Sequence, residues 1–223
     1  GQMSAALAHE INQPLTALRM QLASLRLLLD NGREGEVREG LGHVEGLLER
    51  MAALTGHLKT FARKSPAGLQ QHLALADVLE QALQLLSPRI RSEQVEVFRQ
   101  VPTEATVRGD AIRLEQVLIN LLHNALDAMA ERPQRRLRIL CRRVGDAWQL
   151  SVADNGGGIA SEHLDQVFEP FFTTKPVGQG LGLGLAVSYG IVRDMGGTLE
   201  VSNDEQGAVF TLTLPAAEVH AAE

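Results

Sequence analysis

Two glycine-rich segments in the C-terminal half of the chain carry residue types that could bind a nucleotide. Glycines stand at alternate positions in both segments, as Gly156 and Gly158 in the first and as Gly180, Gly182 and Gly184 in the second. Glycine lets the backbone approach a ligand closely, and backbone N–H groups at the start of a helix bind anions. The second segment leads into the apolar run 185–187. The pattern therefore predicts phosphate binding, with an ordinary glycine loop as the alternative.

Asp154 makes the nucleotide interpretation stronger than the ordinary loop. It ends the strand-like run 150–153 and stands directly before the first glycine segment. A carboxylate is a pure acceptor, so at a strand end it can accept a hydrogen bond from the exocyclic amino group of adenine. Asp154 therefore favours an adenine nucleotide as the ligand.

Two asparagines lie on a strongly periodic helical stretch that Asp110 is expected to cap. Asn120 and Asn124 are four residues apart, so they share one face of that helix. Their amide oxygens suit Mg²⁺, which takes oxygen ligands and keeps several waters. A solvated polar face is the alternative, and the two asparagines alone do not decide between them.

A histidine near the start of the chain could accept a phosphoryl group. Six apolar residues there are spaced 4, 3, 4, 3, 4, which is a heptad seam: Ile11, Leu15, Leu18, Leu22, Leu25 and Leu29. His9 lies two positions before this seam and so faces about 200° away from it, toward solvent. Its imidazole titrates near neutrality and can act as a nucleophile, with Glu10 beside it to take a proton. Taken by itself, it would be an inconsequential surface histidine.

Taken together, these segments resemble a known family. Asp154-x-Gly156-x-Gly158, the stretch 168–172 (Phe-Glu-Pro-Phe-Phe) and Gly180-x-Gly182-x-Gly184 look like the first glycine box, the F box and the second glycine box of sensor histidine kinases. Residues 120–125 resemble the N box, and residues 9–15 (His-Glu-Ile-Asn-Gln-Pro-Leu) resemble the H box, in a form similar to that of C4-dicarboxylate and oxygen or nitrogen sensors. The resemblance extends from His9 to the strand before Pro215.

The resemblance implies a role for each of these residues. His9 would be the phosphoacceptor and Glu10 its acid/base partner, while Asp154 would bind adenine and the glycines the phosphates of ATP. Asn124 would coordinate Mg²⁺ with help from Asn120. Gln13 stands where related kinases place a threonine or asparagine that positions water, which leaves a response-regulator phosphatase activity open.

One position departs from the family pattern. Many of these kinases carry a lysine or arginine three residues after the second asparagine of the N box, where it contacts phosphate, but this chain has Asp127. Lys175 is our candidate for the missing positive charge. A solvated lysine without a role is the alternative.

The order of helical and strand-like segments predicts two domains of an α + α/β protein. Residues 1–65 would form an antiparallel helical hairpin, with a turn near 31–35, that pairs in a homodimer as a four-helix bundle. A linker at 66–70 would precede an α/β sandwich at 71–217, which the resemblance identifies as an ATP-binding domain of the Bergerat (GHKL) type, and a tail at 218–223 would follow. Its sheet is expected to be mixed and backed by helices.

Composition narrows the partners and the location. The 223 residues carry a formal net charge of −6, so no general nucleic-acid partner is expected. The single cysteine, Cys141, suits a reducing compartment. No apolar run approaches the roughly 20 residues that span a bilayer. We expect a cytoplasmic fragment without membrane contact, from a parent either soluble or anchored in the inner membrane, with a response regulator receiver domain as partner.

Two other functions are compatible with parts of this sequence. An ATPase of the gyrase or heat-shock chaperone kind would share the nucleotide fold, but it usually carries a glutamate where Asn120 stands. A dimeric scaffold with a decayed ATP site would have lost some of the motif residues. The N box and the H box favour the kinase over both.

Overall fold

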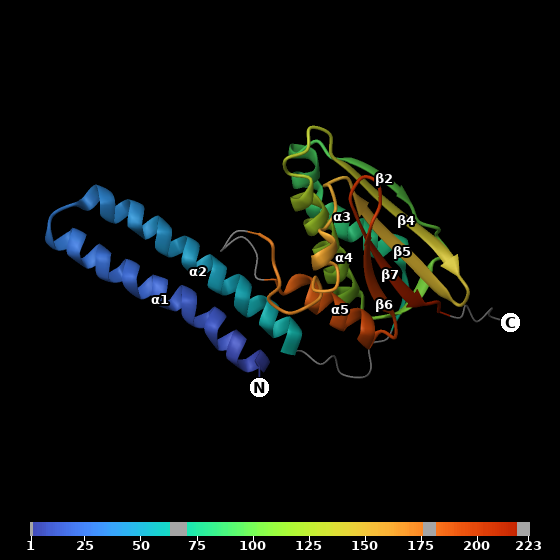
Figure 1. Cartoon of the computed structure of the whole chain (residues 1–223), viewed down its shortest axis with the longest axis horizontal. Coiled ribbons are helices and arrows are strands. Elements are labelled where there is room, and N and C mark those ends of the chain that lie inside the picture. The colour runs from blue at the N-terminus through green and yellow to red at the C-terminus, as the bar shows by residue number, and fades with distance from the viewer. Residues whose placement is uncertain (1, 63–70, 176–181, 218–223) are drawn as a thin grey trace. The chain divides into compact units, whose positions relative to one another are not determined.

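The computed structural model describes residues 2–62, 71–175 and 182–217. Within the N-terminal helices, the backbone is described throughout and the side chains in part. The chain divides into two compact units, of which one holds the N-terminal helices up to residue 64 and the other most of the remainder. Each unit is described below by itself (Figure 1).

The first unit is a helical hairpin, as expected. Helix α1 (Gln2–Asp30) and helix α2 (Glu34–Ala62) are joined by a turn in which Gly32 has a φ of 71°. The Asn31 side chain closes the end of α1 by donating to the carbonyl of Leu27 at 2.6 Å. Leu25 is buried where α2 presents Gly40, since a Cβ there would lie 2.6 Å from the Leu25 Cδ2 atom. The helices therefore pack closely at this point.

The second unit contains a mixed sheet with the strand order β2-β4-β5-β7-β6. β2 runs parallel to β4, whereas the β4–β5, β5–β7 and β6–β7 pairs are antiparallel. The strands are β2 (Glu96–Gln100), β4 (Arg136–Val144), β5 (Ala147–Asp154), β6 (Thr198–Asn203) and β7 (Ala208–Pro215). The mixed sheet expected from the sequence is confirmed.

Three helices cover one face of this sheet (Figure 1). They are α3 (Leu75–Ser92), α4 (Ala111–Ala128) and α5 (Gly184–Asp194). A two-stranded sheet of β1 (Gln71–Ala74) and β3 (Thr106–Gly109) and a short 3-10 turn (Ser161–His163) complete the unit. The apolar side chains between sheet and helices form its hydrophobic core.

Helix α3 is longer than the sequence pattern predicts. The pattern of apolar residues predicts a helix over about 77–86, but α3 begins at Leu75, whose N–H donates to the carbonyl of Ala105 at 2.8 Å. At the other end it continues through Pro88 to Ser92, because Ile90 still packs against the core. The proline marks no boundary here, and this extension brings Arg89 into the site described below.

Helix α4 is the centre of the core, and its packing gives a first prediction. Asp110 caps it as expected, since its Oδ1 atom accepts from the N–H groups of Ile112 and Arg113 at 3.0 and 3.2 Å. Leu118 is fully buried, so Leu118→Ala should lower the free energy of unfolding by about 2–5 kcal/mol. Ile112→Ala, on the same helix but 73% exposed, should change it by less than about 0.5 kcal/mol. Urea unfolding of both variants tests this, and equal losses would contradict it.

Candidate active site

Asp154 lies at the end of β5, with its side chain on the helix-covered side of the sheet. It shares the alternation of Leu150 and Val152, which are both buried against the helices. Its Oδ1 atom accepts from the N–H of Gly156 at 2.7 Å and from that of Ala208 at 3.4 Å. No described residue donates to Oδ2, which leaves this oxygen available to a ligand.

Burial controls the electrostatics of this carboxyl group. Asp154 is only 5% exposed, and burial raises its pKa above the ordinary value although the N–H groups of Gly156 and Ala208 act in the opposite direction. Desolvating a charge without full compensation costs free energy. The site therefore holds a carboxylate that would gain from a ligand donor.

The first glycine segment packs directly against the end of α4. A Cβ on Gly156 would lie 2.6 Å from the Cβ and the carbonyl oxygen of Ala128, so only glycine fits there. At Gly158, which has a φ of 81°, the neighbour is Asn203. The Asn203 amide holds Ile159 by accepting from its N–H at 2.9 Å and donating to its carbonyl at 2.7 Å. This asparagine was missed by the sequence analysis, because nothing in the sequence links β6 to this loop.

The two asparagines of α4 lie on one face, as predicted, but they have different surroundings. The Asn120 Nδ2 atom donates to the carbonyl of Gly184 and to the hydroxyl of Ser188, both at 3.2 Å. It thereby ties α4 to the first turns of α5. Asn124 is partly buried and makes no side-chain hydrogen bond to a described residue. Its amide is free to bind something else.

The second glycine segment is described from Gly182 onward, so Gly180 lies outside the described residues. Gly182 has a φ of 63°, and its carbonyl accepts from the N–H of Phe171 at 2.9 Å. A side chain at Gly182 would meet the backbone of Phe172, which again requires glycine. Gly184 is the first residue of α5 and lies beside Asn120.

Lys175 and Asp127 form an ion pair at 2.5 Å between Nζ and Oδ2. The other carboxylate oxygen of Asp127 accepts from Arg89 of α3 at 2.7 Å. Burial alone would raise the pKa of Asp127, but the hydrogen bonds from Lys175 and Arg89 outweigh it and hold that pKa below the ordinary value. Asp127 therefore pairs with two cations, Lys175 and Arg89.

The sequence does not predict the role of Arg89, since this residue precedes the N box by about thirty residues and fits no motif.

The predicted phosphoacceptor belongs to the other unit. His9, Glu10 and Gln13 all lie on α1, which runs as one helix through Pro14. Their side chains lie outside the described part of the structure. Their helical placement agrees with the expected hairpin, and their roles remain predictions.

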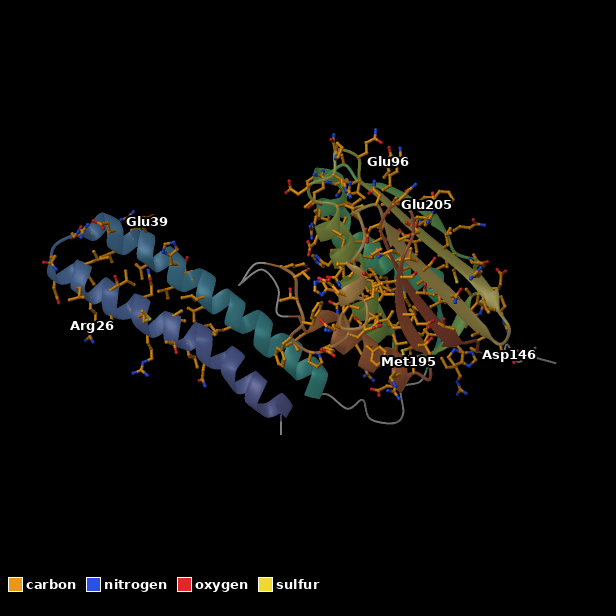
Figure 2. The ribbon with its side chains drawn as sticks, viewed as in Figure 1. Arg26, Glu39, Glu96, Asp146, Met195 and Glu205 are labelled. Atoms are coloured by element: carbon orange, nitrogen blue, oxygen red, sulfur yellow. The ribbon has the colours of Figure 1, made fainter. Side chains whose placement is uncertain are left out.

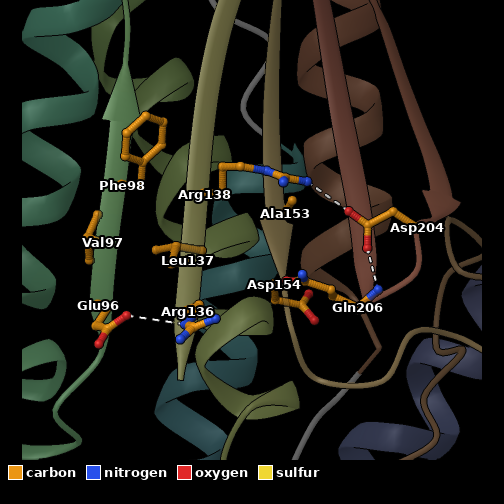
Figure 3. Close-up of a pocket in the computed structure, with 10 residues that line it drawn as sticks. All are labelled: Glu96, Val97, Phe98, Arg136, Leu137, Arg138, Ala153, Asp154, Asp204 and Gln206. Carbon is orange, nitrogen blue, oxygen red and sulfur yellow. Dashed lines mark hydrogen bonds and ion pairs between the residues drawn. The ribbon is translucent and has the colours of Figure 1, made fainter. Parts of the chain in front are cut away.

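The sheet also carries a hollow of about 240 Å³ (Figure 3). Phe98 and Arg138 line it from the exposed face, and Arg138 pairs there with Asp204 at 2.8 Å. Asp154 borders this hollow, but its side chain follows the buried alternation of β5. The hollow is therefore a surface feature distinct from the site between Asp154 and α4. Figure 2 shows Glu205 near one end of the sheet and Asp146 at the other, and Asp154 belongs to the Glu205 end.

The described residues are suited to bind a nucleotide together with a metal ion. Asp154 offers an acceptor for adenine, and Asn124 offers a neutral oxygen on the adjoining helix. The described residues include no group of three or more histidine, cysteine or acidic side chains that could hold a metal alone. A single amide oxygen suits Mg²⁺ that keeps its waters and arrives with phosphates.

This geometry, a carboxylate at a strand end facing a helix with two asparagines, defines an ATP-binding domain. Comparison agrees, because residues 109–218 match the family model described as histidine kinase-, DNA gyrase B-, and HSP90-like ATPase. Residues 1–67 match the model of the His Kinase A (phospho-acceptor) domain. The chain belongs to the sensor histidine kinases, and it is a protein-histidine kinase core of the two-component type.

Individual relatives support the same assignment. The chain is 42% identical to the C4-dicarboxylate transport sensor protein DctB of Pseudomonas aeruginosa, over 96% of this chain and 35% of that protein. DctB of Rhizobium meliloti is 39% identical over 96% of this chain and 34% of its own length. The chain thus spans about a third of these relatives. The predicted similarity to C4-dicarboxylate sensors is confirmed.

Solved structures match both units. The catalytic domain of the histidine kinase ThkA is 32% identical with a TM-score of 0.60, covering 66% of this chain and 95% of that one. ThkA in complex with the response regulator TrrA gives a TM-score of 0.76 at 25% identity, covering 97% of this chain and 62% of that one. Among the helices within the described ranges, none is long and apolar enough to cross a membrane.

Proposed function

We propose that this core binds Mg·ATP between Asp154 and α4 and transfers the γ-phosphoryl group to His9. The observation that carries the proposal is the buried Asp154 carboxylate, which has one oxygen held by backbone N–H groups and the other without a described donor. Adenine carries an amino group that fits this oxygen. The phosphoacceptor family match over residues 1–67 supplies the second substrate.

In the proposed reaction, a ring nitrogen of His9 attacks the γ-phosphorus and the bond to the ADP oxygen breaks. The result is phosphohistidine and ADP, and Glu10 takes the proton that the imidazole sheds. Positioning and charge neutralisation supply most of the rate in such transfers. Asn124, with Asn120 assisting, would hold Mg²⁺, which would neutralise charge on the phosphate oxygens.

The remaining residues of the site are assigned by their places in it. The glycines Gly156, Gly158, Gly180, Gly182 and Gly184 are assigned to nucleotide binding. Three of them, Gly156, Gly158 and Gly182, let their segments pack closely against Ala128, Asn203 and Phe172. Lys175 supplies the positive charge for the phosphates, and Asp127 holds it in place. We divide the chain accordingly into residues 1–65 for phosphotransfer, a linker at 66–70, the ATP-binding domain at 71–217 and a tail at 218–223.

The hairpin is proposed to pair with a second copy in a four-helix bundle. It leaves several large apolar side chains at least 40% exposed, namely Leu15, Met20, Leu22, Leu27, Leu29, Leu41 and Leu48. Apolar stripes of this kind gain free energy when a partner covers them. A second hairpin packed against the first would cover these side chains.

The phosphoryl group is proposed to pass from His9 to an aspartate of a response regulator in the cytoplasm. The support is the solved relative that binds such a regulator. Gln13, one helical turn after His9, is the residue to which we assign any hydrolysis of the regulator's phosphoryl group. A parent protein anchored in the inner membrane is compatible with this arrangement.

Parallel incubations with ATP labelled at the α or the γ position test the reaction class. A kinase retains label on the protein only from the γ position, in a form that is labile to acid and stable to alkali. An ATPase releases labelled phosphate and leaves the protein unlabelled. The second outcome would refute the proposed function.

A further inference from the structure

Helix α4 presents a stripe of four polar side chains opposite its buried face. They are Asn120, His123, Asn124 and Asp127, spaced so that all four share one side of the helix. The two asparagines and Asp127 have been placed in the site above. His123 is the member of the stripe that the proposed reaction does not use.

The two ends of this stripe are tied to the segment that carries the second glycine box. Asn120 donates to the carbonyl of Gly184, at the C-terminal end of that segment. Asp127 pairs with Lys175, at its N-terminal end. His123 and Asn124 lie between these anchors on α4. Both are therefore on the part of the helix where the phosphates are proposed to bind.

A single contact fixes the protonation of His123. The Nη1 atom of Arg89 lies 3.0 Å from His123 Nδ1. A guanidinium group can only donate, so Nδ1 must accept and the ring proton resides on Nε2. No described residue bonds this Nε2–H group. The imidazole thus offers one fixed donor to a ligand.

Burial and the surrounding charges both act on the pKa of this imidazole. Arg89 and Glu93 face it from α3, Asp127 from its own helix, and Lys175 from the loop after the F box. Burial and the Arg89 and Lys175 cations lower the pKa of His123, while Asp127 and Glu93 oppose them more weakly. A proton on Nδ1 would also break the hydrogen bond from Arg89. This contact therefore holds the ring proton on Nε2.

We propose that His123 is a further phosphate-binding residue, which donates from Nε2 to the γ-phosphate, and that Arg89 is its positioning residue. The inference rests on the proposed function, because the ligand is the phosphate tail of ATP. Asp127 occupies the place where many related kinases carry a cation. A fixed imidazole N–H beside Asn124 gives this helix a phosphate contact of its own.

Calorimetric titration with Mg·ATP and Mg·ADP isolates the contact with the γ-phosphate. His123→Ala should reduce the preference for ATP over ADP about tenfold, since a hydrogen bond to a charged group is lost. His123→Gln, whose amide nitrogen can take the place of Nε2, should keep most of this preference. His123→Asn, whose shorter amide corresponds to Nδ1, should lose it.

The outcomes separate this inference from the proposed function. If the unaltered chain binds neither nucleotide, the proposed function fails. If it binds both and His123→Ala leaves the ATP preference unchanged, or if all three substitutions reduce it equally, His123 makes no such contact. Either of the latter results overturns the inference alone.

Nitrogen NMR of the His123 ring tests the role of Arg89 without any nucleotide. The unaltered protein should show the ring proton on Nε2, because Nδ1 accepts from Arg89. In Arg89→Lys, which keeps a cation for Asp127 but loses the planar fork, the ring should instead populate both tautomers. A ring that carries its proton on Nδ1 in the unaltered protein, or a tautomer that Arg89→Lys leaves unchanged, would overturn the assignment.

Discussion

Asp154→Asn should weaken ATP binding on the order of a hundredfold or more. The substitution removes a charged acceptor and places the asparagine NH₂ group opposite the adenine amino group, so that two donors face each other. The asparagine Oδ1 atom can still accept from the N–H groups of Gly156 and Ala208, so the loop keeps its shape. Its Nδ2 atom would meet the amino group of adenine. The same amide could donate to the oxygen of guanine, so the preference for ATP over GTP should shrink or reverse. Titration with both nucleotides measures this.

Although Asp154→Asn should bind ATP more weakly, its folded state should be as stable as that of the unaltered chain or more stable. Burial raises the pKa of Asp154, so the folded state binds this proton more tightly than the unfolded state does. The ionised carboxylate therefore costs stability, and this cost develops as the pH rises from the ordinary carboxyl pKa through the raised folded value. At neutral pH, Asp154→Asn should unfold at the same temperature as the unaltered chain or at a higher one.

Asp204 provides a matched control for this substitution. Its Oδ1 atom also accepts two backbone N–H groups, from Gln206 at 2.8 Å and Gly207 at 3.0 Å, but it lies outside the proposed adenine site. Asp204→Asn should leave the affinities for ATP and GTP unchanged. A comparable loss in both variants would mean that Asp154 only supports the fold.

Asn124→Ala should lower the rate of autophosphorylation on the order of a hundredfold, because the metal ligand from α4 is lost. Nucleotide binding measured in excess chelator should match that of the parent, since the adenine site is intact. Thermal stability should also be unchanged, because the Asn124 side chain bonds no described residue. Rates measured over a range of Mg²⁺ concentrations check the assignment.

The Asn120→Ala variant provides the comparison for this test. It removes hydrogen bonds to Gly184 and Ser188, so it should lower the unfolding temperature as well as the rate. The assignment of Asn124 fails if Asn124→Ala loses affinity equally with and without metal. It also fails if the rate is unaffected.

The elements of the fold follow from the sequence wherever the periodicity is local. The heptad seam around Leu18 and Leu25 predicts the hairpin, and the Asp110 cap with the apolar stripe through Leu118 predicts α4 to within a residue or two. The pattern predicts that α3 ends near residue 86, but the helix continues through Pro88 to Ser92 because Ile90 packs against the core.

The site was predictable in its motifs and not in its long-range contacts. Asp154 and the asparagine pair stand in recognisable local patterns. The pairing of Asp127 with Lys175 and Arg89 joins three separate elements, and no pattern within one element encodes it. The sequence shows that Asp127 stands where related kinases carry a cation. The ion-pair partners of Asp127 become known only from the folded structure. The same holds for Asn203, which reaches the first glycine box from β6.

The measurement that tests the central claim most directly is the location of the phosphoryl group after incubation with Mg·ATP. Peptide mass spectrometry under alkaline conditions should place it on His9. His9→Gln should carry none while binding ATP with the parent's affinity. Phosphorylation that persists in His9→Gln, or that maps to another residue of the parent, would contradict the account.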